Sequence, residues 1–175
     1  VCWHVDDLLM TQTEEKVICE LVSSLEKTYG KLNVKVSNEL EYLGMDFKFA
    51  DGAVKISQEQ FTLELIEEFP EPIDRIAEDP AADNLFEVNE PSEKNPLLGK
   101  EQAQAFHRTT AKLLYLCARA RRDIRVPVAF LTTRVRAPCA EDWTKLRRVL
   151  RYLYRNPALL LLSLIHISEP TRPRL

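Results

Sequence analysis

The chain has 175 residues, of which 45% are hydrophobic and 29% are charged, and its formal net charge is -3 at pH 7. This length and composition suit one ordinary globular core or part of a larger one, and they exclude a disordered chain. The first residue is Val1 rather than Met, and no charged segment precedes an apolar run, so we expect no secretory signal and a start inside a longer coding sequence.

The first predicted feature is a pair of adjacent carboxylates. Asp6 and Asp7 lie in the stretch HVDDLLM, between apolar residues. Two neighbouring like charges cannot relieve their repulsion inside a hydrophobic core, so water or a cation must face them. A solvated turn satisfies this pattern, and so does a divalent metal site of the kind that supports phosphoryl transfer.

A helix and a strand are predicted next. Thr11-x-x-Glu14 is typical of a capping box, and apolar residues then recur on one helical face until Gly30. The residues of that face are Val17, Ile18, Leu21, Val22, Leu25 and Tyr29. Residues 32–36 alternate between apolar and polar, which predicts a strand.

Extended chain and a hairpin should follow. In ELEYLGMDFKF the apolar phase changes beside Gly44, which indicates a bulge or a bend within extended chain. Asp51-Gly52 between two apolar runs predicts a β-hairpin. Ser57-x-x-Gln60 then indicates the start of a helix, with Phe61, Leu65, Ile66 and Phe69 on its inner face.

The second half of the chain combines two segments of opposite charge. Residues 67–93 are acidic and contain four prolines spaced along them, so we expect a solvated connector with little regular structure. Beyond Gly99 two or three helices are predicted, with Phe106, Leu113, Leu114 and Cys117 inward on one and Trp143, Leu146, Leu150 and Leu153 inward on another. The basic residues of this half are Lys112, Arg119, Arg121, Arg122, Arg125, Arg134, Arg136, Lys145, Arg147, Arg148, Arg151 and Arg155.

The cysteines and the apolar run near the C-terminus indicate where in the cell the protein is expected. Cys2, Cys19, Cys117 and Cys139 form no C-x-x-C pair and have no His at zinc-ligand spacing, so we expect reduced thiols, a cytoplasmic or nuclear location and no zinc. The apolar run from residue 159 has about half of the roughly 20 residues that a membrane span needs, so no membrane partner is expected.

Residues 162–175 need a separate interpretation. LSLIHISEPTR is the codon-by-codon translation of a DNA sequence that resembles a transposase-type sequencing adapter. We therefore expect Leu162 to Leu175 to be an artefact and exclude them from the predicted fold. A genuine amphipathic tail is the alternative.

The order of motifs along the chain resembles a known family. HVDDLL, an amphipathic helix, YGKLNV, EYLGMDF, an Asp-Gly hairpin, ISQEQF, LLYLCARARRDI and RVLRYL follow one another as in the reverse transcriptases of copia-type long-terminal-repeat retrotransposons. The resemblance covers residues 1–156 and implies an α+β fold. It assigns residues 1–56 to the end of the palm and a primer-grip hairpin, 57–99 to a thumb helix and the acidic connector, and 100–156 to a basic helical connection region.

The resemblance also implies roles for residues and partners. HVDD corresponds to the family's Tyr-x-Asp-Asp motif, so Asp6 and Asp7 would be catalytic and would hold Mg²⁺ (or Mn²⁺) in the intact enzyme. The residues implied to grip the primer are Tyr42, Leu43, Gly44 and Met45. Those expected to contact nucleic acid are Lys112, Arg119, Arg122, Lys145, Arg148 and Arg151. The implied partners are an RNA template, a DNA primer, dNTP and the rest of a retrotransposon polyprotein, in a cytoplasmic virus-like particle or the nucleus.

Several departures limit what the resemblance implies. His4 replaces the usual tyrosine and is expected to pack within a strand, and Arg122 stands where the family usually has proline. The fingers and the strand with a third metal-binding aspartate would lie before Val1, so we expect this chain alone to be inactive. The alternative is a non-catalytic nucleic-acid-binding or interaction module from a decayed element, in which Asp6 and Asp7 form only a turn.

Overall fold

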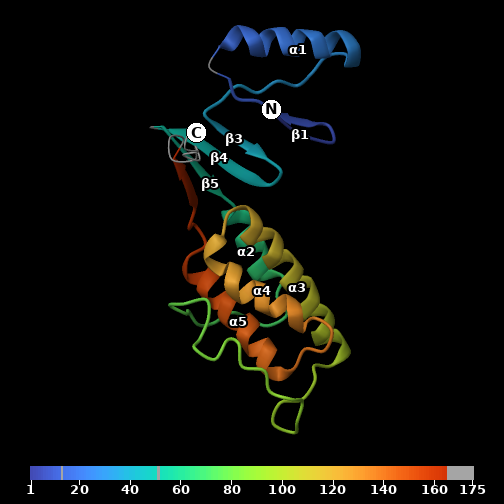
Figure 1. Ribbon diagram of the computed structural model, residues 1–175, viewed down its shortest axis with the longest axis vertical. Coiled ribbons are helices and arrows are strands. Elements are labelled where there is room, and N and C mark those ends of the chain that lie inside the picture. The colour runs from blue at the N-terminus through green and yellow to red at the C-terminus, as the bar shows by residue number, and fades with distance from the viewer. Residues whose placement is uncertain (13, 51, 165–175) are drawn as a thin grey trace, which may run out of the picture.

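The computed structural model describes residues 1–12, 14–50 and 52–164, and over these residues the fold is α+β, as predicted. Figure 1 shows α1 and the β1–β2 hairpin at one end of the molecule, a sheet in the middle and α2 to α5 at the other end. The strands are β1 (Cys2–His4), β2 (Asp7–Leu9), β3 (Glu39–Tyr42), β4 (Met45–Ala50), β5 (Ala53–Ser57) and β6 (Leu161–Leu164). The helices are α1 (Glu15–Tyr29), α2 (Glu59–Glu67), α3 (Lys100–Arg119), the 3₁₀ turn η1 (Arg122–Ile124), α4 (Arg125–Arg134) and α5 (Ala140–Arg155).

Helix α1 confirms the first predicted helix but corrects how it begins. Its N-cap is Glu14, which makes no side-chain capping bond, so the capping box expected from Thr11 is wrong. Gly30 ends the helix as predicted, with a φ of 85° and its N–H bonded to the Glu26 carbonyl. No residue of α1 is buried, and Leu21 is 37% exposed. The predicted apolar face therefore has only partial cover in this structure.

The predicted strand at residues 32–36 is wrong, because these residues have no regular structure. Val34 and Val36 are 48% and 86% exposed. Alternation predicts a strand only where a neighbouring strand supplies hydrogen-bond partners, and no ladder among the described strands reaches these residues.

The central sheet has four antiparallel strands in the order β3-β4-β5-β6. The phase change beside Gly44 is a hairpin turn between β3 and β4, which corrects the predicted bulge within one extended segment. The Asp-Gly hairpin is confirmed, since Ala50 pairs with Ala53, although Asp51 itself lies outside the described residues. Across the sheet Leu40, Phe47, Ile56 and Leu161 occupy one row.

The last strand includes the first residues of the adapter-like segment. Leu161–Leu164 forms β6, and Leu162 pairs with Lys55 of β5. The rest of the adapter-like segment, residues 165–175, lies outside the described residues. The interpretation of Leu162 to Leu175 as an artefact stays a prediction.

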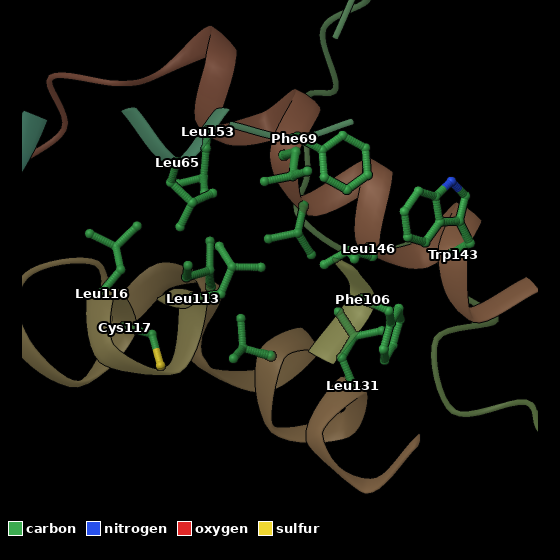
Figure 2. Close-up of a cluster of buried hydrophobic side chains, with 14 residues drawn as sticks. Leu65, Phe69, Phe106, Leu113, Leu116, Cys117, Leu131, Trp143, Leu146 and Leu153 are labelled. Carbon is green, nitrogen blue, oxygen red and sulfur yellow. The ribbon is translucent and has the colours of Figure 1, made fainter. Parts of the chain in front are cut away.

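The hydrophobic core lies among α2, α3, α4 and α5. Figure 2 shows Trp143 of α5 beside Phe69, and Leu146 and Leu153 of α5 pointing toward the other buried side chains. The fully covered members include Phe106, Leu113, Leu116, Ile124, Val128, Leu131, Leu146, Val149, Leu150 and Leu153. The predicted inner face of α5 is confirmed, whereas Leu114, expected to point inward from α3, is 48% exposed.

The acidic connector between α2 and α3 has little regular structure, as predicted, but it packs against the helices. Phe69 stacks on the Trp143 ring with 5.0 Å between centroids, and Leu85 is 5% exposed. The Ala77 N–H bonds to the Arg151 carbonyl of α5. Residues 68–90, called the connector strap below, therefore run beside α5 (Figure 1).

Candidate catalytic hairpin and nucleic-acid interface

The two adjacent aspartates lie at the tip of the β1–β2 hairpin. His4 pairs with Asp7, so Val5 and Asp6 form the two-residue turn and Asp7 begins β2. Val5 has a φ of 51°, where a β-branched residue is strained and glycine is usual. The Trp3 indole donates a hydrogen bond of 2.6 Å to the Val5 carbonyl and braces the turn from the same strand.

The carboxylates of Asp6 and Asp7 both face solvent. His4 is also exposed, so its expected packing within a strand is wrong. Hard cations such as Mg²⁺ bind carboxylate oxygens and retain waters, so the two side chains fit part of a metal site. Over the described part of the chain, no group of three or more acidic, His or Cys side chains is placed to hold a metal. A complete site needs a further ligand from elsewhere.

Strand β3 brings the expected primer-grip segment near this hairpin. Tyr42 at the end of β3 is half-buried, and that burial raises the pKa of its phenol. The charges of Cys2 on β1 and Asp7 on β2 raise this pKa further, because they disfavour a second negative charge. Tyr42 and Asp7 are therefore electrostatic neighbours although their strands belong to different sheets.

Leu43 and Gly44 form the tight turn between β3 and β4, and Tyr42 pairs with Met45 across it. Their φ angles are 52° and 66°, and a type I′ hairpin turn requires positive φ at both central residues. Glycine adopts this conformation freely, whereas leucine does so at a cost. The four residues expected to grip a primer end thus form one compact hairpin tip.

This turn is held by the helical region. The Tyr115 hydroxyl of α3 donates a hydrogen bond of 2.9 Å to the Leu43 carbonyl, and the Gln58 amide donates one of 3.1 Å to the Gly44 carbonyl. The Tyr115 ring packs on Phe61 of α2 at 5.3 Å between centroids. Sequence reasoning missed Tyr115 and Gln58, because contacts between distant segments leave no periodic signal.

The six expected nucleic-acid contacts divide into two groups. The first group lies on α3 and η1: Lys112 pairs with Glu68, Arg119 stacks over the Tyr115 ring at 4.2 Å, and Arg122 is exposed. The arrangement of Arg119 above Tyr115 places one cation beside the β3–β4 turn.

The second group, Lys145, Arg148 and Arg151, lies on α5 under the connector strap. Lys145 is 9% exposed and donates to the Glu87 carbonyl at 2.6 Å. Arg148 donates to the Asp79 carbonyl at 3.2 Å, and Arg151 pairs with Asp74 at 3.8 Å. These three cations already face oxygen atoms of the same chain.

A buried cation joins the segment after α3 to the C-terminal end of α5. Arg121 is 1% exposed, binds the Asp123 carboxylate at 2.8 Å and donates to the Asn156 carbonyl at 2.7 Å. Burial opposes ionisation of Asp123, but the hydrogen bonds and charge of Arg121 outweigh it and lower the pKa of that carboxyl. In the RRDI stretch, Arg121 is thus a structural residue, whereas Arg122 is on the surface.

Among the helices that the structure describes, none is long and apolar enough to cross a membrane.

Comparison with known proteins finds similarity to a Saccharomyces cerevisiae (strain ATCC 204508 / S288c) protein named "Putative transposon Ty5-1 protein". The two are 26% identical over 162 residues, which cover 90% of this chain and 49% of that protein. The chain thus spans about half the length of this relative. No protein-family profile matches the chain, and no solved structure matches it.

Proposed function

We propose that this chain is a fragment of a retrotransposon polyprotein, taken from a reverse transcriptase that extends a DNA primer on an RNA template. The similarity to a yeast transposon protein supports the retrotransposon origin. The observation that carries the polymerase proposal is the pair Asp6 and Asp7, exposed at a hairpin tip whose second strand is an electrostatic neighbour of Tyr42.

The two aspartates would supply oxygen ligands for the metal. Mg²⁺ (or Mn²⁺), when bound, would activate the attacking primer hydroxyl and neutralise charge on the dNTP phosphates. Asp6 and Asp7 occupy successive positions at the tip of one hairpin, next to the strained backbone of Val5. Preorganised carboxylates need no rearrangement when metal arrives, which is what a catalytic site requires.

The β3–β4 turn would place the primer end. Its backbone is constrained by the positive φ angles of Leu43 and Gly44 and by the bonds from Tyr115 and Gln58. Lys112, Arg119 and Arg122 on the neighbouring helical surface would meet the phosphates of the RNA–DNA duplex, with contacts that depend on salt.

A second candidate is a non-catalytic nucleic-acid-binding or interaction module. It is favoured by the lack of a third acidic ligand beside Asp6 and Asp7 within residues 1–12, 14–50 and 52–164. In this second candidate function Asp6 and Asp7 form only a solvated turn, and the Lys and Arg side chains alone bind the partner.

The genomic sequence upstream of Val1 separates the two candidates. The polymerase proposal predicts an in-frame strand that bears an aspartate, followed by a helix. A chain restored with that segment should extend a DNA primer on an RNA template in the presence of Mg²⁺. An in-frame stop codon directly upstream, or a folded restored chain that extends no primer with either metal, would support the non-catalytic module instead.

A further inference from the structure

The basic face of α5 carries a regular row of arginines. Arg147, Arg151 and Arg155 are four residues apart, so successive side chains lie about 6 Å apart along the helix axis on one face. Each pairs with an acidic residue of the connector strap: Arg147 with Glu71 at 3.2 Å, Arg151 with Asp74 at 3.8 Å, and Arg155 with Glu78 at 3.3 Å. The strap thus lays a row of negative charges along a row of positive ones.

The strap is buried at its ends, whereas its middle is held by exposed ion pairs and by the hydrogen bonds of Ala77 and Asp79 with α5, which a competing ligand would have to break. At one end Glu71 also accepts a hydrogen bond of 2.9 Å from the Trp143 indole, and at the other Leu85 is buried. In between, the side chains of Asp74 and Glu78 are 61% and 86% exposed. Exposed ion pairs are screened by water and salt and contribute little, so the middle can exchange its partners.

Space remains between the middle of the strap and α5. A hollow of about 460 Å³ lies beneath residues 75–82, and Lys145, Arg148 and Arg151 contribute to its wall. The Nε atoms of Arg147 and Arg151 are buried and have no hydrogen-bond partner among the described residues. The strap therefore leaves part of the hydrogen-bonding capacity of this face unused.

We propose that the α5 face formed by Arg147, Arg151 and Arg155 is a polyanion-binding surface whose resident occupant is the connector strap, and that nucleic acid binds there by displacing residues 74–82. The proposal rests on the proposed nucleic-acid function and adds its regulation. Phosphates of a duplex would replace the carboxylates of Asp74 and Glu78, while the buried ends of the strap stay in place.

The test compares two double variants of the full chain that carry equal charge. Asp74→Asn with Glu78→Gln uncovers the arginines, whereas Asp83→Asn with Glu90→Gln removes two exposed strap acids for which the structure shows no ion pair. Binding of a fluorescent RNA–DNA hybrid duplex is measured by anisotropy at low and moderate salt, after equal thermal unfolding midpoints have been confirmed.

The uncovered variant should bind more tightly than the charge-matched control by at least about twofold, since two ion pairs are lost and each exposed ion pair shifts an equilibrium by a factor of about 1.5 to 5. Adding Arg151→Gln and Arg155→Gln should abolish that gain. A plot of the logarithm of its binding constant against the logarithm of salt concentration should also have a slope steeper by about 0.9 for each additional phosphate contact.

Equal gains in the two double variants would overturn the proposal, because they would show a general charge effect. The absence of duplex binding by every folded variant at low salt would overturn it as well. Primer extension by the restored chain is a separate measurement. Failure of the strap proposal would appear in duplex binding, whereas failure of the polymerase proposal would appear in primer extension.

Discussion

Tyr115 and Leu43 lie 72 residues apart in the sequence, and the hydroxyl of the first donates a hydrogen bond of 2.9 Å to the main-chain carbonyl of the second. The bond joins helix α3 to the tip of the β3–β4 hairpin. Because Leu43 is held at a positive φ of 52°, the contact from Tyr115 stabilises a turn that its own sequence does not favour.

Tyr115→Phe should loosen this turn while leaving the helices intact. The ring contacts with Phe61 and Arg119 remain, and only the hydroxyl is lost. We expect a loss of about 0.5–1.5 kcal/mol in the free energy of unfolding. Amide hydrogen exchange should become faster at Leu43 to Met45. Tyr154→Phe is the matched control, since Tyr154 is 49% exposed. Unchanged exchange in Tyr115→Phe would show that the bond does not hold the turn.

The Arg121–Asp123 pair predicts a loss of stability in acid. The pKa of Asp123 is lowered by Arg121 from an ordinary value of 3.8, so its contribution is complete above that value and is lost as the pH falls through the lower, folded-state pKa. Unfolding midpoints measured between about pH 6 and about pH 2 should fall less steeply in Asp123→Asn than in the parent. Parallel curves would contradict this assignment.

Two leucines of the helical region should respond very differently to truncation. Leu146 of α5 is fully buried, so Leu146→Ala should destabilise the chain by about 2–5 kcal/mol through lost contacts and a cavity. Leu114 of α3 is 48% exposed, and Leu114→Ala should cost well under about 1 kcal/mol. Denaturant unfolding of both variants decides the matter, and comparable losses would mean that α3 is rotated from the described orientation.

Local sequence patterns correctly predicted the elements that depend only on neighbouring residues. The inner face of α5 follows from Trp143, Leu146 and Leu150, and the β4–β5 hairpin from Asp51-Gly52. The prediction of a strand at residues 32–36 failed because none of the described strands pairs with these residues. Alternation of apolar and polar residues is a property of one segment, whereas a strand also needs a second strand that supplies hydrogen-bond partners.

The candidate site was predictable only in part. Asp6 and Asp7 stand out locally because adjacent charges interrupt an apolar run. Tyr115 and Gln58 donate hydrogen bonds to the β3–β4 turn only because the chain folds back on itself, and no residue spacing in the sequence indicates these contacts. The acidic connector looked like a solvated linker, because composition does not reveal that its charges match the arginine row of α5.

The adapter-like segment makes a prediction about the source DNA. We interpret LSLIHISEPTR as a translation of adapter-type DNA, so amplification across the Asn156 codon should reach a different coding sequence after about residue 161. Sequencing of independently prepared genomic DNA is the measurement. Recovery of the same eleven residues there would establish the segment as part of the gene.

The catalytic proposal makes its sharpest prediction at Asp6 and Asp7. The two exposed carboxylates cannot complete a two-metal site alone, so the chain without an upstream segment should extend no primer. In a restored chain, Asp6→Asn and Asp7→Asn remove charge at nearly constant shape. Each should slow extension by at least about 10²- to 10³-fold, the typical cost of losing one preorganised electrostatic contact.

The measurement is primer extension on an RNA template with Mg²⁺, comparing the restored parent with Asp6→Asn and Asp7→Asn at equal thermal stability. Asp46→Asn on β4 is the control for loss of one negative charge, since Asp46 is also exposed. We expect the parent and Asp46→Asn to extend the primer at similar rates and both hairpin variants to extend it at least about 10²-fold more slowly. Extension by Asp6→Asn at the rate of the parent would contradict this expectation and leave the pair as a solvated turn.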